Sequence, residues 1–192
     1  MAKKIRVGFD MDGVLLYNPF RIGRPIIAFI KKYFLKRKTT KFYLPRPGLE
    51  SFIWTVMHKS SYFIAPGLDD IKEMIKNNEI EAYIVTSRYK SLKTDVDHWF
   101  NKINKEKLFH NCYYNDGNEQ PHEYKERKIR ELKLDYFVED NWDVVNHVNT
   151  YLHKNKVKTK VLWITNILDM HIQYPYKFTS LKKAVEYIKN NF

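Results

Sequence analysis

The sequence has a single cysteine, Cys112, in 192 residues. One cysteine excludes an internal disulfide framework and, without histidine or cysteine at ligand spacing, a thiolate metal cluster. Six glycines and seven prolines are too few for a fibrous or low-complexity chain. The 44% of hydrophobic residues can form a sizeable core, which argues against an intrinsically disordered chain. The length suits one domain that carries a modest insertion.

Long hydrophobic runs are missing as well. The longest apolar tract, residues 25–35, is interrupted by Lys31 and Lys32 and is too short to span a bilayer. The N-terminus has basic residues but neither a long apolar core nor a cleavage site of small residues, so we expect no signal peptide. We therefore expect a soluble, cytoplasmic protein without a transmembrane segment. The sequence does not indicate its oligomeric state.

Negative charge is scarce in one region of a chain whose formal net charge is +12. No acidic residue lies between Asp12 and Glu50. The basic residues of this region are Arg21, Arg24, Lys31, Lys32, Lys36, Arg37, Lys38, Lys41 and Arg46. Such an excess of cations indicates an anionic partner, which leaves open a phosphorylated small molecule, nucleic acid or a lipid surface.

Short apolar runs alternate with longer amphipathic ones over most of the chain. The apolar runs predict strands at residues 5–9, 81–85, 109–114, 136–138 and 161–164. The amphipathic runs predict helices at residues 68–75, 92–100, 122–132, 144–152 and 181–188. This alternation is typical of an α/β fold in three layers, a Rossmann-like parallel sheet covered by helices on both faces. Ligands of such sheets bind beyond the carboxyl ends of the strands.

Residues 17–66 interrupt this alternation, because they are too many for an ordinary connection. They contain two helical patterns, at residues 25–38 and 49–58, and several aromatic side chains. We predict a small helical cap here, inserted after the first strand into a core domain of residues 1–16 and 67–192. Its aromatic and basic residues could stack on a base and pair with phosphate, or the aromatic residues could form the cap's own small core.

Two carboxylates, Asp10 and Asp12, follow the first predicted strand directly. Without a counter-charge their placement at the end of a buried element would cost several kcal/mol. A divalent cation such as Mg²⁺ would compensate this cost. An ionised Asp10 could attack an electrophile, while Asp12 could donate a proton to a leaving group and accept one from water. A solvated turn with a capping role is the alternative interpretation.

The run from Asp10 to Leu15, Asp-Met-Asp-Gly-Val-Leu, resembles the first motif of the haloacid dehalogenase superfamily of aspartyl-phosphate phosphatases. The family's second motif is a Thr or Ser that binds the phosphoryl group at the end of the second core strand. Thr86 matches it, with Ser87 beside it; alternatively, these two residues only cap a helix that begins near Tyr89. The resemblance also implies binding of phosphoryl oxygens by the backbone near Met11.

The third family motif is a lysine at the start of the helix before the fourth core strand. Lys125 and Lys128 both lie there, and Lys125 is favoured because the first helical turn points toward the carboxyl ends of the strands. The fourth motif is an acidic pair after that strand, and Glu139 and Asp140 match it. The commoner family form is Asp-Asp, so Glu139 is a departure that changes the reach of one ligand.

The alternative interpretation of the fourth motif is an N-cap at Asp140 or Asn141 for the next helix. A cap would explain one carboxylate but not three, because Asp143 follows three positions later. Lys128, Asp143 and Arg88 are further candidates for the site. The four motifs together imply a sheet in which the first strand is central and lies between the second and fourth core strands.

The resemblance implies hydrolysis of a phosphate monoester with Mg²⁺ as cofactor. Its ligands would be Asp10, Asp12, Glu139 and Asp140, and the catalytic residues would be Asp10 and Asp12. Motif spacing is similar to the deoxyribonucleotidase-like branch of the family, which favours a nucleotide as the phosphorylated substrate. The alternative is a basic protein that binds nucleic acid or a membrane surface with little or no catalysis.

Overall fold

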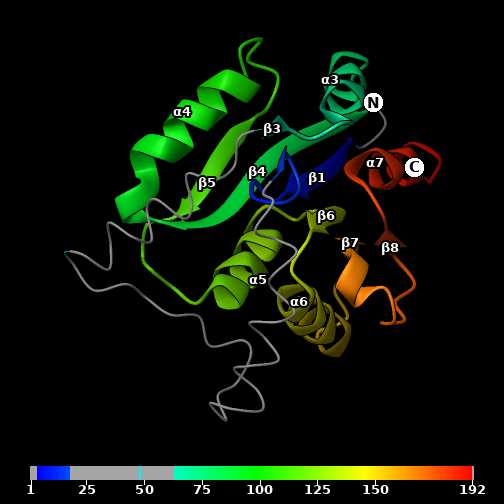
Figure 1. The fold of residues 1–192 in the computed structure, drawn as a ribbon. Coiled ribbons are helices and arrows are strands. Elements are labelled where there is room, and N and C mark those ends of the chain that lie inside the picture. The colour runs from blue at the N-terminus through cyan, green and yellow to red at the C-terminus, as the bar shows by residue number, and fades with distance from the viewer. Residues whose placement is uncertain (1–3, 18–47, 49–62, 192) are drawn as a thin grey trace.

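The computed structural model describes residues 4–17, 48 and 63–191. A six-stranded sheet in the order β5-β4-β1-β6-β7-β8 forms its centre (Figure 1). Its strands are β1 (Ile5–Phe9), β4 (Ile80–Tyr89), β5 (Asn111–Asn115), β6 (Tyr136–Glu139), β7 (Lys160–Ile164) and β8 (Lys177–Phe178). All neighbouring strands in this sheet are parallel. The strand β1 lies between β4 and β6, which confirms the arrangement that the resemblance implies.

Helices cover both faces of the sheet. The first face packs against α3 (Leu68–Lys76), α4 (Lys93–Ile103) and α7 (Leu181–Lys189), and the second against α5 (Pro121–Glu131) and α6 (Trp142–Lys154). Local sequence explains where three of them begin. Proline at the first position starts α5, where no backbone N–H is needed, and side chains of Asn141 and Ser180 cap α6 and α7.

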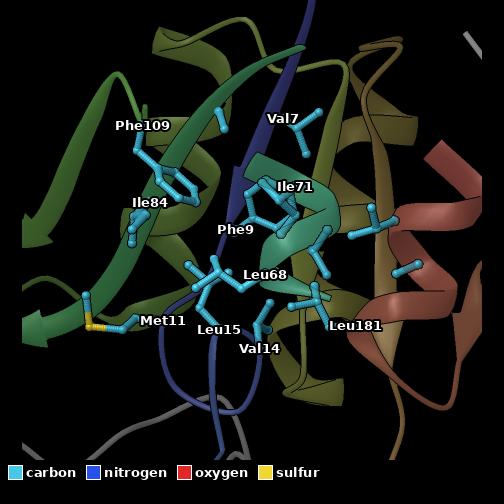
Figure 2. Packing of buried hydrophobic residues seen from close by; sticks show 14 of the residues in the cluster. Val7, Phe9, Met11, Val14, Leu15, Leu68, Ile71, Ile84, Phe109 and Leu181 are labelled. Carbon is cyan, nitrogen blue, oxygen red and sulfur yellow. The ribbon is translucent and has the colours of Figure 1, made fainter. Parts of the chain in front are cut away.

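Alternating strand residues supply two separate cores. Val7 and Phe9 point into the first core, where Figure 2 shows Phe9 packed near Ile71 of α3. Tyr83 and Val85 of β4 instead point into the second core, under α5 and α6. Because successive side chains of a strand face opposite sides of the sheet, both faces must be apolar in a sheet that is covered on both sides. The strands are therefore held rigidly, and their carboxyl ends form a fixed edge.

The strands and helices predicted outside residues 17–66 are all present, with small differences at their ends. The largest difference is in β4, which continues past the predicted end at Val85 to Tyr89. The sequence analysis missed β8 and a two-stranded antiparallel ribbon of β2 (Leu16–Tyr17) and β3 (Phe63–Ile64), because pairs of residues give no readable period. No helix within the described parts of the chain is long and apolar enough to cross a membrane.

The ribbon formed by β2 and β3 brings together the two ends of the predicted insertion. Leu16 pairs with Ile64, and Tyr17 pairs with Phe63. The predicted helices at residues 25–38 and 49–58 lie outside the described residues. The helical cap at residues 17–66 therefore stays a prediction, and the ribbon fixes only where that segment leaves the sheet and returns to it.

Gly67, which precedes α3, has a backbone conformation that glycine favours, and this leads to a stability prediction. Its φ is +107°, and a Cβ added there would lie 2.9 Å from the backbone nitrogen of Lys182. Gly67→Ala should therefore lower the free energy of unfolding by about 1–3 kcal/mol, measured by denaturant titration. Gly117→Ala is the matched control, since its Cβ would come no closer than 3.5 Å to Glu119. Equal stabilities of the two variants would contradict this explanation.

Candidate active site

A cleft at the carboxyl edge of the sheet collects most of the residues that the sequence analysis selected. Its volume is about 100 Å³. The lining residues come from the loop after β1, from the end of β4 and the helical turn that follows it, from the start of α5, and from the end of β6 and the start of α6. They are Asp10, Asp12, Thr86, Ser87, Arg88, Tyr89, Leu92, Pro121, Lys125, Glu139, Asp140, Asn141 and Val144.

A tight loop after β1 positions the first two carboxylates. The backbone N–H of Asp10 donates to the carbonyl of Val138 at 3.0 Å, so Asp10 still belongs to the sheet. The chain then turns back, with the N–H of Gly13 bonded to the carbonyl of Leu16 at 2.7 Å. Gly13 has a φ of +79°, a conformation that side-chain-bearing residues rarely adopt. This turn brings both Asp10 and Asp12 to the same cleft.

The ammonium group of Lys125 lies between two buried carboxylates. Its Nζ is 2.8 Å from Oδ2 of Asp10 and 2.5 Å from Oε2 of Glu139. Burial alone would lower the pKa of Lys125, but the charges of Asp10 and Glu139 outweigh it and raise this pKa. Lys128, the alternative, pairs with Glu131 and lies outside the cleft. The geometry thus places Lys125, and not Lys128, beside Asp10.

Three buried carboxylates, Asp10, Glu139 and Asp140, each offer an oxygen within 4.8 Å of the others. Burial is the main cause that raises the pKa of Asp10, and the charges of Asp140 and Asp12 raise it further. Burial likewise raises the pKa of Glu139 to about 8, although Lys125 opposes this shift. One lysine does not balance three carboxylates, so a divalent cation fits the charge and the donor set of this cluster.

Glu139 also organises the loop after β6. Its Oε1 accepts hydrogen bonds from the backbone N–H groups of Asp140 at 3.0 Å and Asn141 at 2.9 Å. Its other oxygen binds Lys125. The longer glutamate side chain, a departure from the commoner Asp-Asp motif, thus joins the lysine to the acidic loop. Asn141 caps α6 by accepting from the N–H of Asp143, which confirms the capping role that the sequence left open for Asn141.

The end of β4 supplies hydroxyl groups and an arginine. Thr86 is buried in the cleft, and its Oγ1 accepts a hydrogen bond from the N–H of Arg88 at 3.3 Å. The interpretation of Thr86 and Ser87 as helix caps is wrong, because the chain stays extended to Tyr89 and α4 starts at Lys93 without a side-chain cap. Arg88 also lines the cleft, where it forms an ion pair with Asp12.

The predicted residues separate into two groups. The cleft brings together Asp10, Asp12, Thr86, Ser87, Arg88, Lys125, Glu139 and Asp140. Lys128, Asp143 and the buried Met11 do not line it, although the backbone N–H of Met11 donates to Oδ1 of Asp10 at 2.8 Å. The sequence analysis missed five lining residues, which are Tyr89, Leu92, Pro121, Asn141 and Val144. The available signal for these residues was their position at the ends of predicted strands or the starts of predicted helices, where ligands of such sheets bind.

No family model matches the sequence, and no curated protein matches it at a significant level. Solved structures do match the fold. CbbY from Rhodobacter sphaeroides, solved with phosphate, has a TM-score of 0.56 at 12% identity, over 94% of this chain and 96% of its own. A protein from Thermotoga maritima assigned as a β-phosphoglucomutase has a TM-score of 0.58 at 13% identity, over 98% of this chain and 100% of its own.

A haloacid dehalogenase-like family hydrolase from Xanthomonas campestris also matches, with a TM-score of 0.55 at 9% identity, over 97% of this chain and 95% of its own. The chain therefore has the fold of the haloacid dehalogenase-type hydrolases and phosphatases.

Proposed function

We propose that this protein is a Mg²⁺-dependent phosphatase that hydrolyses a phosphate monoester through an aspartyl-phosphate intermediate. The observation that carries the proposal is the cluster of Asp10, Lys125 and the acidic loop in one cleft. A carboxylate that acts as a nucleophile toward phosphorus needs nearby cations, and Lys125 lies 2.8 Å from it. The fold shared with known hydrolases and phosphatases supports the same reaction class.

Magnesium fits the oxygen donors of Asp10, Glu139 and Asp140, whose buried charges exceed that of Lys125. Asp12 was also predicted as a ligand, and it lines the same cleft. When bound, Mg²⁺ would neutralise charge on the phosphoryl oxygens and hold them for in-line attack. The donor set contains no nitrogen or sulfur, which favours Mg²⁺ over the transition metals.

The residues of the cleft divide the reaction between them. An oxygen of Asp10 forms a bond to phosphorus while the bond from phosphorus to the ester oxygen breaks, and Asp12 gives its proton to that oxygen. Water then forms a new bond to phosphorus as the bond to Asp10 breaks, and Asp12 takes the proton of the water. Lys125 and Thr86 stabilise charge on the phosphoryl oxygens, helped by Ser87 and the N–H of Met11.

The substrate we propose is a phosphorylated small molecule, with a nucleotide as the first candidate. CbbY has been solved with phosphate, and a CbbY variant with xylulose-1,5-bisphosphate. The nucleotide proposal depends on the basic and aromatic residues between positions 17 and 66, which would form the pocket for the leaving group. Binding of nucleic acid or of a lipid surface depends on the same segment, which lies almost entirely outside the described residues.

Hydrolysis of p-nitrophenyl phosphate tests this proposal. We expect turnover with Mg²⁺, loss of turnover in EDTA, and recovery when Mg²⁺ is added back. A panel of phosphorylated metabolites and nucleotides would then identify the natural leaving group. Strong, salt-sensitive binding to DNA or anionic vesicles without any turnover would contradict the proposal and favour a binding protein.

Asp140→Asn should weaken Mg²⁺ binding by at least about tenfold, because it removes a charged oxygen donor from the buried cluster. The measurement is the rise of the melting temperature with Mg²⁺ concentration in the absence of substrate. Asp143→Asn is the matched control, since Asp143 lies in the first turn of α6 but does not line the cleft. A wild-type response from Asp140→Asn, or an equal loss in both variants, would remove Asp140 from the ligand set.

A further inference from the structure

A chain of ion pairs runs from the cleft to the first turn of α4. The Nε atom of Arg88 donates to Oδ2 of Asp12 at 2.8 Å, and its Nη2 donates to Oδ1 of the same carboxylate at 2.7 Å. Its remaining nitrogen, Nη1, donates to Oδ2 of Asp95. All three guanidinium nitrogens therefore face carboxylates of the protein.

The surroundings of Arg88 hold it in place. Its side chain is only 1% exposed, and those of Asp12 and Asp95 are 13% and 16% exposed. Its backbone N–H is bonded to Thr86, so the arginine is fixed at both ends. A guanidinium that grips a carboxylate with two parallel bonds determines the plane of that carboxylate as well as its position.

We propose that Arg88 and Asp95 are positioning residues, which set where the carboxyl group of Asp12 delivers and receives its proton. Asp12 fixes one edge of the guanidinium and Asp95 fixes the other, so Asp95 acts on Asp12 through Arg88. This inference rests on the proposed function, in which Asp12 exchanges a proton with the leaving group and with water. The sequence analysis gave Arg88 only as a further candidate for the site, without a role; the alternative role for a cation in this cleft is binding of the phosphoryl group.

The two roles have different kinetic consequences. A positioned acid increases the rate of ester cleavage when the leaving group is a poor one, such as an alcohol. It has little effect on this rate when the leaving group is p-nitrophenolate, which departs without a proton. A phosphate ligand, in contrast, acts on every substrate alike and on the affinity for inorganic phosphate. The kcat/KM value covers the steps up to departure of the leaving group, so comparing this value between substrates isolates the role of the acid.

The experiment compares kcat/KM for glycerol phosphate with kcat/KM for p-nitrophenyl phosphate in Asp95→Asn. We expect the ratio of the two values to fall about tenfold relative to wild type, because a misplaced acid loses part of its effect. Asp97→Asn is the matched control, since Asp97 lies on the same helix but pairs with Lys93 on the exposed surface. An unchanged ratio in Asp95→Asn, or an equal change in both variants, would overturn the proposal.

Arg88→Lys supplies an independent test. Lysine keeps the positive charge but cannot form the two parallel bonds, so we expect the same fall in the ratio with an unchanged inhibition constant for inorganic phosphate. A weaker inhibition by phosphate, with the ratio preserved, would assign Arg88 to the phosphoryl group and overturn the positioning role. Melting temperatures of all variants separate these effects from loss of folding.

These results also distinguish the two levels of the proposal. Wild-type protein that hydrolyses neither ester would overturn the proposed function together with the inference. Wild-type turnover with unaltered ratios in Asp95→Asn and Arg88→Lys would overturn only the inference and leave the phosphatase in place.

Discussion

Asp10→Asn should reduce the hydrolysis of phosphate esters by a factor of roughly 10³ or more, because an amide cannot act as the nucleophile toward phosphorus. The measurement is kcat with p-nitrophenyl phosphate at saturating Mg²⁺. The fold should survive, since Asp10 is bound to the sheet through its backbone, which the substitution does not change. The substitution also removes one of the crowded negative charges of the acidic cluster.

Asp97→Asn is a suitable comparison for Asp10→Asn, because it makes the same chemical change on an exposed helix surface. It should retain wild-type turnover. Substantial activity of Asp10→Asn, with a melting temperature and Mg²⁺ response like those of the wild type, would remove Asp10 from the role of nucleophile.

Lys125→Met should cost both stability and activity. It leaves the buried carboxylates of Asp10 and Glu139 without their shared cation, and removal of one partner from a buried ion pair typically costs about 3–5 kcal/mol. Activity should fall about a hundredfold or more, since one electrostatic contact to the developing charge is lost. Denaturant titration and steady-state kinetics give the two values.

The stability loss of Lys125→Met should depend on pH in a defined direction. Burial already raises the pKa values of Asp10 and Glu139 above those of an unfolded chain. Lys125 opposes this shift in the wild type, so both pKa values are higher still in the folded variant. The stability of the variant therefore falls more steeply with rising pH than that of the wild type. Without Mg²⁺, the loss should be larger at pH 8 than at pH 5.5.

Lys128→Met is the control for Lys125→Met, since both lysines lie on α5 and the sequence allowed either in the site. Lys128 pairs with the half-exposed Glu131, so its loss should cost less than about 1 kcal/mol and leave kcat unchanged. A larger loss of activity in Lys128→Met than in Lys125→Met would contradict the assignment of the lysine.

Much of the fold could be predicted because the pattern of the chain is strong. Runs such as residues 136–138 and 161–164 are apolar throughout, which only a sheet covered on both faces requires. Polar residues directly after these runs also predicted the edge at which the candidate site lies, since parallel strands share their carboxyl edge. The family resemblance supplied the strand order, which local pattern does not determine.

Other features of the site depend on contacts between distant residues, which a single sequence does not reveal. The spacing of four positions between Lys93 and Asp97 indicates their surface ion pair, but nothing in the sequence indicates that Asp95 binds the buried Arg88. Similarly, the choice between Lys125 and Lys128 depends on which side of α5 faces β1. The extension of β4 to Tyr89 was missed because Thr86, Ser87 and Arg88 are polar, and polar residues normally end a buried strand.

Chemical trapping of the covalent intermediate tests the central claim most directly. Protein quenched during turnover with Mg²⁺ and substrate would be treated with borohydride, which reduces an aspartyl phosphate to homoserine, and its tryptic peptides analysed by mass spectrometry. The account predicts homoserine at position 10, in the peptide that starts at Val7 and ends at Arg21. Turnover with an unmodified Asp10, or with the label on any other residue, would contradict it.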